Sequence, residues 1–68
     1  MSKLEEKLRL YREFLEADRA WSVELKRLFG SKAGDVRYAM ESEGTPGTKL
    51  NITYLAFRDA GDSWRKAQ

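Results

Sequence analysis

The sequence predicts an all-α protein with a long first helix, a short second helix and a third helix that packs back along the first as a helical hairpin. Two observations predict this fold class: apolar residues recur at steps of three and four before residue 30, and again after residue 48. A third is the break at 44–48, which holds the chain's single proline between two glycines. We expect residues 1–68 to form a single helical domain.

The first helix is expected to run from about residue 2 to residue 29. Ser2 and Glu5 have the spacing of a capping box, which satisfies free amides at a helix start. Gly30 supplies a left-handed residue after the last turn, where Lys26 and Arg27 complement the helix dipole. The expected core face comprises Leu4, Leu8, Tyr11, Phe14, Leu15, Trp21, Leu25, Leu28 and Phe29.

Two polar residues, Lys7 and Asp18, interrupt this apolar face. Each is expected at its edge, where a long side chain reaches water; the alternative is that a polar core residue sets the register of a helical bundle.

The first helix is long for so small a chain. Its span is about 42 Å at 1.5 Å per residue, whereas a globule of this chain length is about 28 Å across. The helix therefore extends beyond its own domain, and either the rest of the chain or a second copy is expected to cover it.

A short second helix is expected at about 32–43, with Asp35 available as its cap and Val36, Ala39 and Met40 at helical spacing. The Pro46-Gly47 pair then suits a type II turn.

The third helix is expected at about 49–66, with Thr48 as its cap. Gly61 leaves a shallow place on its apolar face that Trp21 or Trp64 is suited to fill. Leu50, Ile52, Tyr54 and Ala56 also alternate, so the alternative is an α+β fold with a β-hairpin at 36–57.

Residue types limit the chemistry that is available. The chain has no cysteine and no histidine, which excludes disulfides, Cys/His zinc sites and cysteine or histidine catalysis. No pair of carboxylates is placed for burial either. We therefore expect no enzyme, no metal and no cofactor.

No apolar run has the length of a signal peptide or a membrane span, so we expect a cytoplasmic protein with no membrane partner.

Charge is unevenly distributed, although the formal net charge is only +2. Residues 19–37 carry five basic and two acidic side chains. Cations near the C-terminal end of a helix also complement its dipole. The alternative explanation of these basic residues is therefore a solvated helix end without a binding role. The residues expected to contact a partner are the basic and aromatic group at the end of the first helix: Arg19, Trp21, Lys26, Arg27 and Arg37.

The segment Gly44-Thr45-Pro46-Gly47-Thr48, followed by Leu50, Tyr54, Ala56, Ala60 and Trp64, resembles small helical accessory proteins of phages and mobile elements. The resemblance covers the last third of the chain. It implies a protein that binds and blocks a host protein, commonly as a dimer, and it assigns no functional residue.

These observations predict a non-enzymatic protein-protein interaction module that forms a homodimer and binds a protein partner, as a phage-type inhibitor of a host protein or regulator does. The alternative is a small nucleic-acid-binding or transcription-regulating protein that uses the same basic group.

Overall fold

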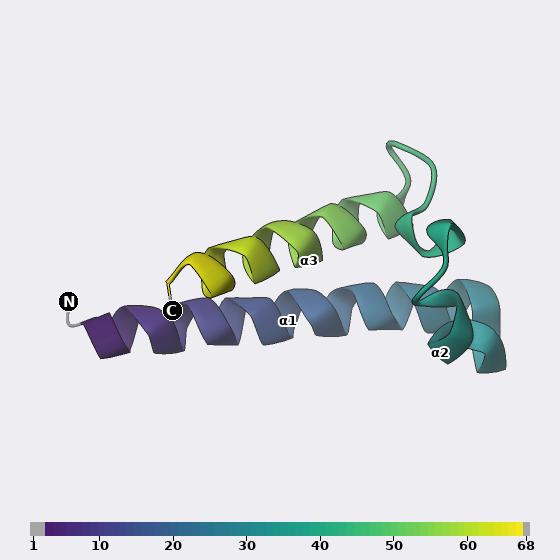
Figure 1. The fold of residues 1–68 in the computed structure, drawn as a ribbon. Coiled ribbons are helices and arrows are strands. Elements are labelled where there is room, and N and C mark those ends of the chain that lie inside the picture. The colour runs from purple at the N-terminus through teal and green to yellow at the C-terminus, as the bar shows by residue number, and fades with distance from the viewer. Residues whose placement is uncertain (1–2, 68) are drawn as a thin grey trace.

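Two antiparallel helices dominate the fold (Figure 1). The structure is a computed structural model that describes residues 3–67. Helix α1 (Lys3–Phe29) is followed by the 3-10 turn η1 (Gly30–Lys32), a single turn of helix α2 (Ala33–Val36), a second 3-10 turn η2 (Met40–Glu43) and helix α3 (Lys49–Lys66). The all-α hairpin is confirmed. Residues 3–67 contain no strand, so the α+β alternative is wrong.

The hairpin has two unlike ends. At the closed end, the last turns of α1 meet α2, η2 and the start of α3; at the open end lie the start of α1 and the end of α3 (Figure 1). Helix α1 has 27 residues and α3 has 18. The first turns of α1 therefore extend past the end of α3, and the molecule measures 40 × 23 × 16 Å.

The predicted boundaries of α1 agree with the structure, although the capping residue Ser2 lies outside the described residues. The helix ends at Phe29, and Gly30 has a φ of 57°, the left-handed conformation that ends a helix without a Cβ clash.

A short second helix lies within the predicted range 32–43, but it is shorter than predicted, because α2 ends at Val36. Ala39 is extended, with a φ of −105° and a ψ of 161°, and only the short turn η2 follows. In a continuing α-helix the carbonyl of Ser42 would bond the amide of residue 46, and Pro46 has no N–H. That carbonyl instead accepts a hydrogen bond of 2.9 Å from Trp21 Nε1.

Helix α3 begins as predicted. Gly47 has a φ of 91°, and the Thr48 amide donates to the Thr45 carbonyl at 3.1 Å, which closes the turn around Pro46. The Thr48 hydroxyl then accepts a hydrogen bond from the Asn51 amide at 3.2 Å, so Thr48 is the cap of α3.

The core lies at the closed end. Trp21, Leu25 and Leu50 are its buried side chains, at 3%, 2% and 5% exposure. The residues packed against them come from α1, α2 and α3: Phe29, Ala33, Val36, Tyr54 and Phe57. The core therefore needs α2 as well as the two long helices.

Much of the predicted core face of α1 is exposed. Of its members, Leu4, Leu8, Tyr11, Leu15 and Leu28 remain between 42% and 67% exposed. Two packed helices bury only the stripe of each that faces the other, so a three-column face is too wide for one neighbour.

Candidate interaction surface

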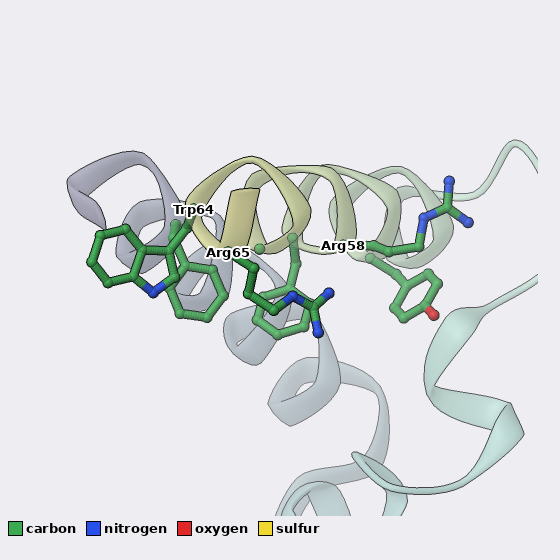
Figure 2. Close-up of a pocket in the computed structure, with 7 residues that line it drawn as sticks. Arg58, Trp64 and Arg65 are labelled. Carbon is green, nitrogen blue, oxygen red and sulfur yellow. The ribbon is translucent and has the colours of Figure 1, made fainter. Parts of the chain in front are cut away.

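An open groove lies between α1 and α3, on the side that Figure 2 shows. It has a volume of about 370 Å³. Four aromatic rings and one glycine form its floor, and two arginines of α3 stand at its rim. We call this surface the aromatic groove; it is lined by Phe14, Tyr54, Phe57, Arg58, Gly61, Trp64 and Arg65.

Ring contacts hold the floor of the aromatic groove in place. Phe14 and Phe57 have ring centroids 5.4 Å apart, and Phe57 stacks on the buried Trp21 at 4.7 Å. Trp64 packs against Tyr11 of α1 at 5.0 Å. Since each contact joins α1 to α3, the floor forms only when the hairpin has formed.

Gly61 gives the floor its depth. A Cβ at this position would lie 3.4 Å from the Phe14 ring, so the glycine lets that ring approach α3 closely. The prediction that Trp21 or Trp64 fills this place is wrong, since Phe14 occupies it.

The rim of the aromatic groove carries two arginines, each beside an aspartate of the same helix. Arg58 lies 3.5 Å from Asp59, and Arg65 forms an ion pair with Asp62, all on α3. The side chains of Arg58 and Arg65 remain 53% and 74% exposed, so both guanidinium groups stay accessible to a ligand (Figure 2).

Tyr54 connects the aromatic groove to η2. Its hydroxyl donates a hydrogen bond of 3.1 Å to Glu43 Oε1. Burial, and then this hydrogen bond, raise the pKa of the Tyr54 hydroxyl. The phenol is therefore protonated at neutral pH and serves the groove as a hydrogen-bonding group and an apolar wall.

The structure separates the residues predicted to contact a partner. Arg19 and Lys26 are exposed on α1, and the structure shows no ion pair for either among residues 3–67. Trp21, in contrast, is in the core. Its ring contacts Tyr54 and Phe57, and its Nε1 group donates to Ser42, so it stabilises the fold and is not on the surface.

Arg37 also has a role within the chain. Its guanidinium lies over the rings of Trp21 and Phe57, at 4.6 and 5.4 Å from their centroids. It donates to the Ser22 hydroxyl at 2.8 Å and forms an ion pair with Asp18. Asp18, the polar residue within the apolar face of α1, therefore holds the segment after α2 against α1 through its ion pair with Arg37.

Arg27 is joined to a buried carboxylate that sequence reasoning missed. Glu24 is 2% exposed; Arg27 Nη2 lies 2.8 Å from its Oε1, and Lys49 Nζ lies 3.8 Å from its Oε2. The hydrogen bond from Arg27 is the main cause that lowers the pKa of Glu24. In the sequence, the spacing of three between Glu24 and Arg27 was the one signal of their ion pair. No sequence signal indicated that Glu24 is buried.

A second apolar surface begins next to the aromatic groove. Trp64 also lines a smaller hollow with Leu4, Lys7, Leu8 and Tyr11 at the open end. We call the exposed apolar face of α1 in this region the N-terminal stripe; it comprises Leu4, Leu8, Tyr11 and Leu15.

Within residues 3–67, no three His, Cys, Asp or Glu side chains are grouped so as to hold a metal ion. No described helix has the length and apolar character needed to cross a membrane.

No protein-family model, curated protein or solved structure matches this chain. The resemblance to phage accessory proteins is therefore untested and stays a prediction.

Proposed function

We propose that the protein is a small non-enzymatic binding module whose aromatic groove takes up an apolar segment of a protein partner that also carries acidic side chains. The observation that carries the proposal is the combination in one open groove of a rigid aromatic floor with Arg58 and Arg65 at the rim. Trp, Tyr and Arg dominate the binding energy of protein interfaces, because they bury large areas at low entropic cost.

The charge of the groove defines the partner's chemistry. Arg58 and Arg65 favour carboxylates beside the apolar segment, and bidentate arginine-carboxylate pairs fix its orientation. Arg19 and Lys26 are exposed basic side chains elsewhere on α1, and they act on the approach of an acidic partner. The expected role is to occupy and block a cytoplasmic host protein, as the phage-type resemblance implies.

The test begins with affinity capture from the native host, followed by binding measurements with the purified partner. Two paired variants compare the two basic surfaces: Arg58→Glu with Arg65→Glu, and Arg19→Glu with Lys26→Glu. We expect the first pair to weaken binding by about tenfold or more, and the second to act mainly through the association rate. A partner that binds the first pair as tightly as the wild type would contradict the use of the groove.

A second candidate is binding to single-stranded nucleic acid, because stacked aromatic rings beside arginines also suit bases and phosphates. This alternative is weakened because Arg27 and Arg37 pair with carboxylates of the same chain, and because Asp59 and Asp62 lie beside the rim arginines, where they repel a phosphate backbone. Fluorescence anisotropy with labelled oligonucleotides tests nucleic-acid binding. The affinity must fall steeply as the salt concentration rises, and the absence of a complex at low salt eliminates this candidate.

A further inference from the structure

One face of α1 is covered along half of its length only. Toward the closed end, Ser22, Leu25 and Lys26 of this face lie against Ala33, Gly34 and Arg37, in and just after α2. Toward the open end, helical spacing places the N-terminal stripe on the same face. There, apart from Trp64 at its edge, no element among residues 3–67 covers the stripe as α2 covers the closed end.

We propose that a second copy of the chain covers the N-terminal stripe, by packing the first half of its own α1 antiparallel against it. The stripe is self-complementary in this arrangement: its residues are spaced by four, three and four, which reads the same in both directions. A twofold axis between Leu8 and Tyr11 places Leu4 opposite the partner's Leu15 and Leu8 opposite the partner's Tyr11.

The position of α2 selects the antiparallel direction. In a parallel pair, the two copies of α2 would meet at the same level of the shared face and hold the stripes apart. In the antiparallel pair, each α2 lies beyond the first residue of the partner's α1. The two stripes can then approach to the 8–10 Å typical of packed helices.

Charge supports the same arrangement. Glu5 and Arg12 lie three residues before and four residues after Leu8, on the same edge of the stripe. The twofold axis brings this edge next to its counterpart and places each Glu5 within one helical turn of the partner's Arg12. Two symmetric pairs of opposite charge then border the apolar contact.

A second copy is a better occupant than an unrelated protein, because covering the stripe enlarges the small apolar core of the chain itself. Domains below about 70 residues seldom bury enough apolar surface alone and often rely on oligomerisation, and only three apolar side chains among residues 3–67 are buried here. The contact is about 17 Å long at 1.5 Å per residue. Its area is at the low end for specific complexes, so the dimer is expected to form at micromolar concentrations and above.

Cysteine cross-linking tests the arrangement directly, because the natural chain has no cysteine. Mixed Leu4→Cys and Leu15→Cys chains are expected to form a disulfide-linked heterodimer under mild oxidation, and neither variant alone is expected to cross-link efficiently. Efficient cross-linking of Leu4→Cys to itself would indicate a parallel pair and overturn the proposal.

Sedimentation equilibrium provides the second measurement. The wild type is expected to rise from the 7.9 kDa monomer to twice that mass with concentration, and Leu8→Lys to raise the dissociation constant by about tenfold or more. Ile52→Lys is the matched control, since Ile52 is a similarly exposed aliphatic residue on α3. A wild type that stays monomeric to millimolar concentration overturns the dimer and leaves the aromatic groove untouched.

Discussion

At the closed end of the hairpin, Trp21 and Leu25 are almost completely buried, whereas at the open end Leu4 and Leu8 of the same helix are more than half exposed. The four side chains belong to one continuous apolar pattern. They differ in what lies next to them: α2, η2 and α3 surround the first pair, and among residues 3–67 only the end of α3 approaches the second. A pair of helices buries one stripe of each, so a broad apolar face becomes core only where a third element covers it.

The largest effect that tests this comparison is expected from shortening a leucine at each end. Leu25→Ala should lower the free energy of unfolding by about 2–5 kcal/mol, because it leaves a cavity in the core. Leu8→Ala should change it by about 0.5 kcal/mol or less in the monomer. Urea unfolding at low protein concentration measures both, and similar losses would show that the two ends are packed alike.

A glycine pair tests the connection that closes the hairpin. Gly44 has a φ of 76° and a ψ of 167°, and an added Cβ would lie 2.9 Å from the Asn51 amide nitrogen. Gly44→Ala should therefore cost about 1–3 kcal/mol. Gly34→Ala, in α2 with no atom within 4 Å of the added Cβ, should stabilise by about 0.4–1 kcal/mol. Thermal unfolding compares them, and destabilisation by both would contradict this account of α2.

The third test concerns the arginine that holds the segment after α2 on α1. Arg37→Ala should lower the free energy of unfolding by about 1–2 kcal/mol, because the cation-π contact with Trp21 and the bond to Ser22 are lost. Arg19→Ala, at an exposed position of α1, is the control and should have little effect. If the Arg37 variant is as stable as this control, Arg37 has no role in stability and is again a candidate for contact with a partner.

The smallest effect is expected from pH. The pKa of Glu24 in the folded protein is below its ordinary value of 4.5, chiefly through the hydrogen bond from Arg27. Its contribution to stability is therefore present above that value and is lost as the pH falls through the lowered pKa. Glu24→Gln should lose less stability than the wild type between neutral pH and about pH 3. Equal losses in acid unfolding curves would show that the closed end does not depend on this ion pair.

Several features were predictable because their causes are local. The steps of three and four identified both long helices, Gly30 identified the end of the first, and Thr48 the start of the third. The length of the second helix was less predictable, because the segment after it is held by a hydrogen bond between Trp21 and Ser42, which are 21 residues apart.

The candidate site was less predictable than the fold. Aromatic and arginine content was a visible signal, and it was assigned to the end of α1, where Trp21 proved to be buried. Arg58 and Arg65 were missed because their spacing along α3 is that of any solvated helix face. Only the packing of Phe14 against Gly61 shows that a groove lies beside them.

The sequence by itself determined that the chain forms two long helices with defined ends, because capping, left-handed glycines and apolar periodicity act within a few residues. The tertiary structure alone decided which parts of the apolar pattern are core and which are surface. That choice depends on where α2 and α3 lie against α1, and a side chain's burial is set by its neighbours in space. It kept Trp21 in the core and off the surface, buried Glu24, and left the aromatic groove and the N-terminal stripe exposed.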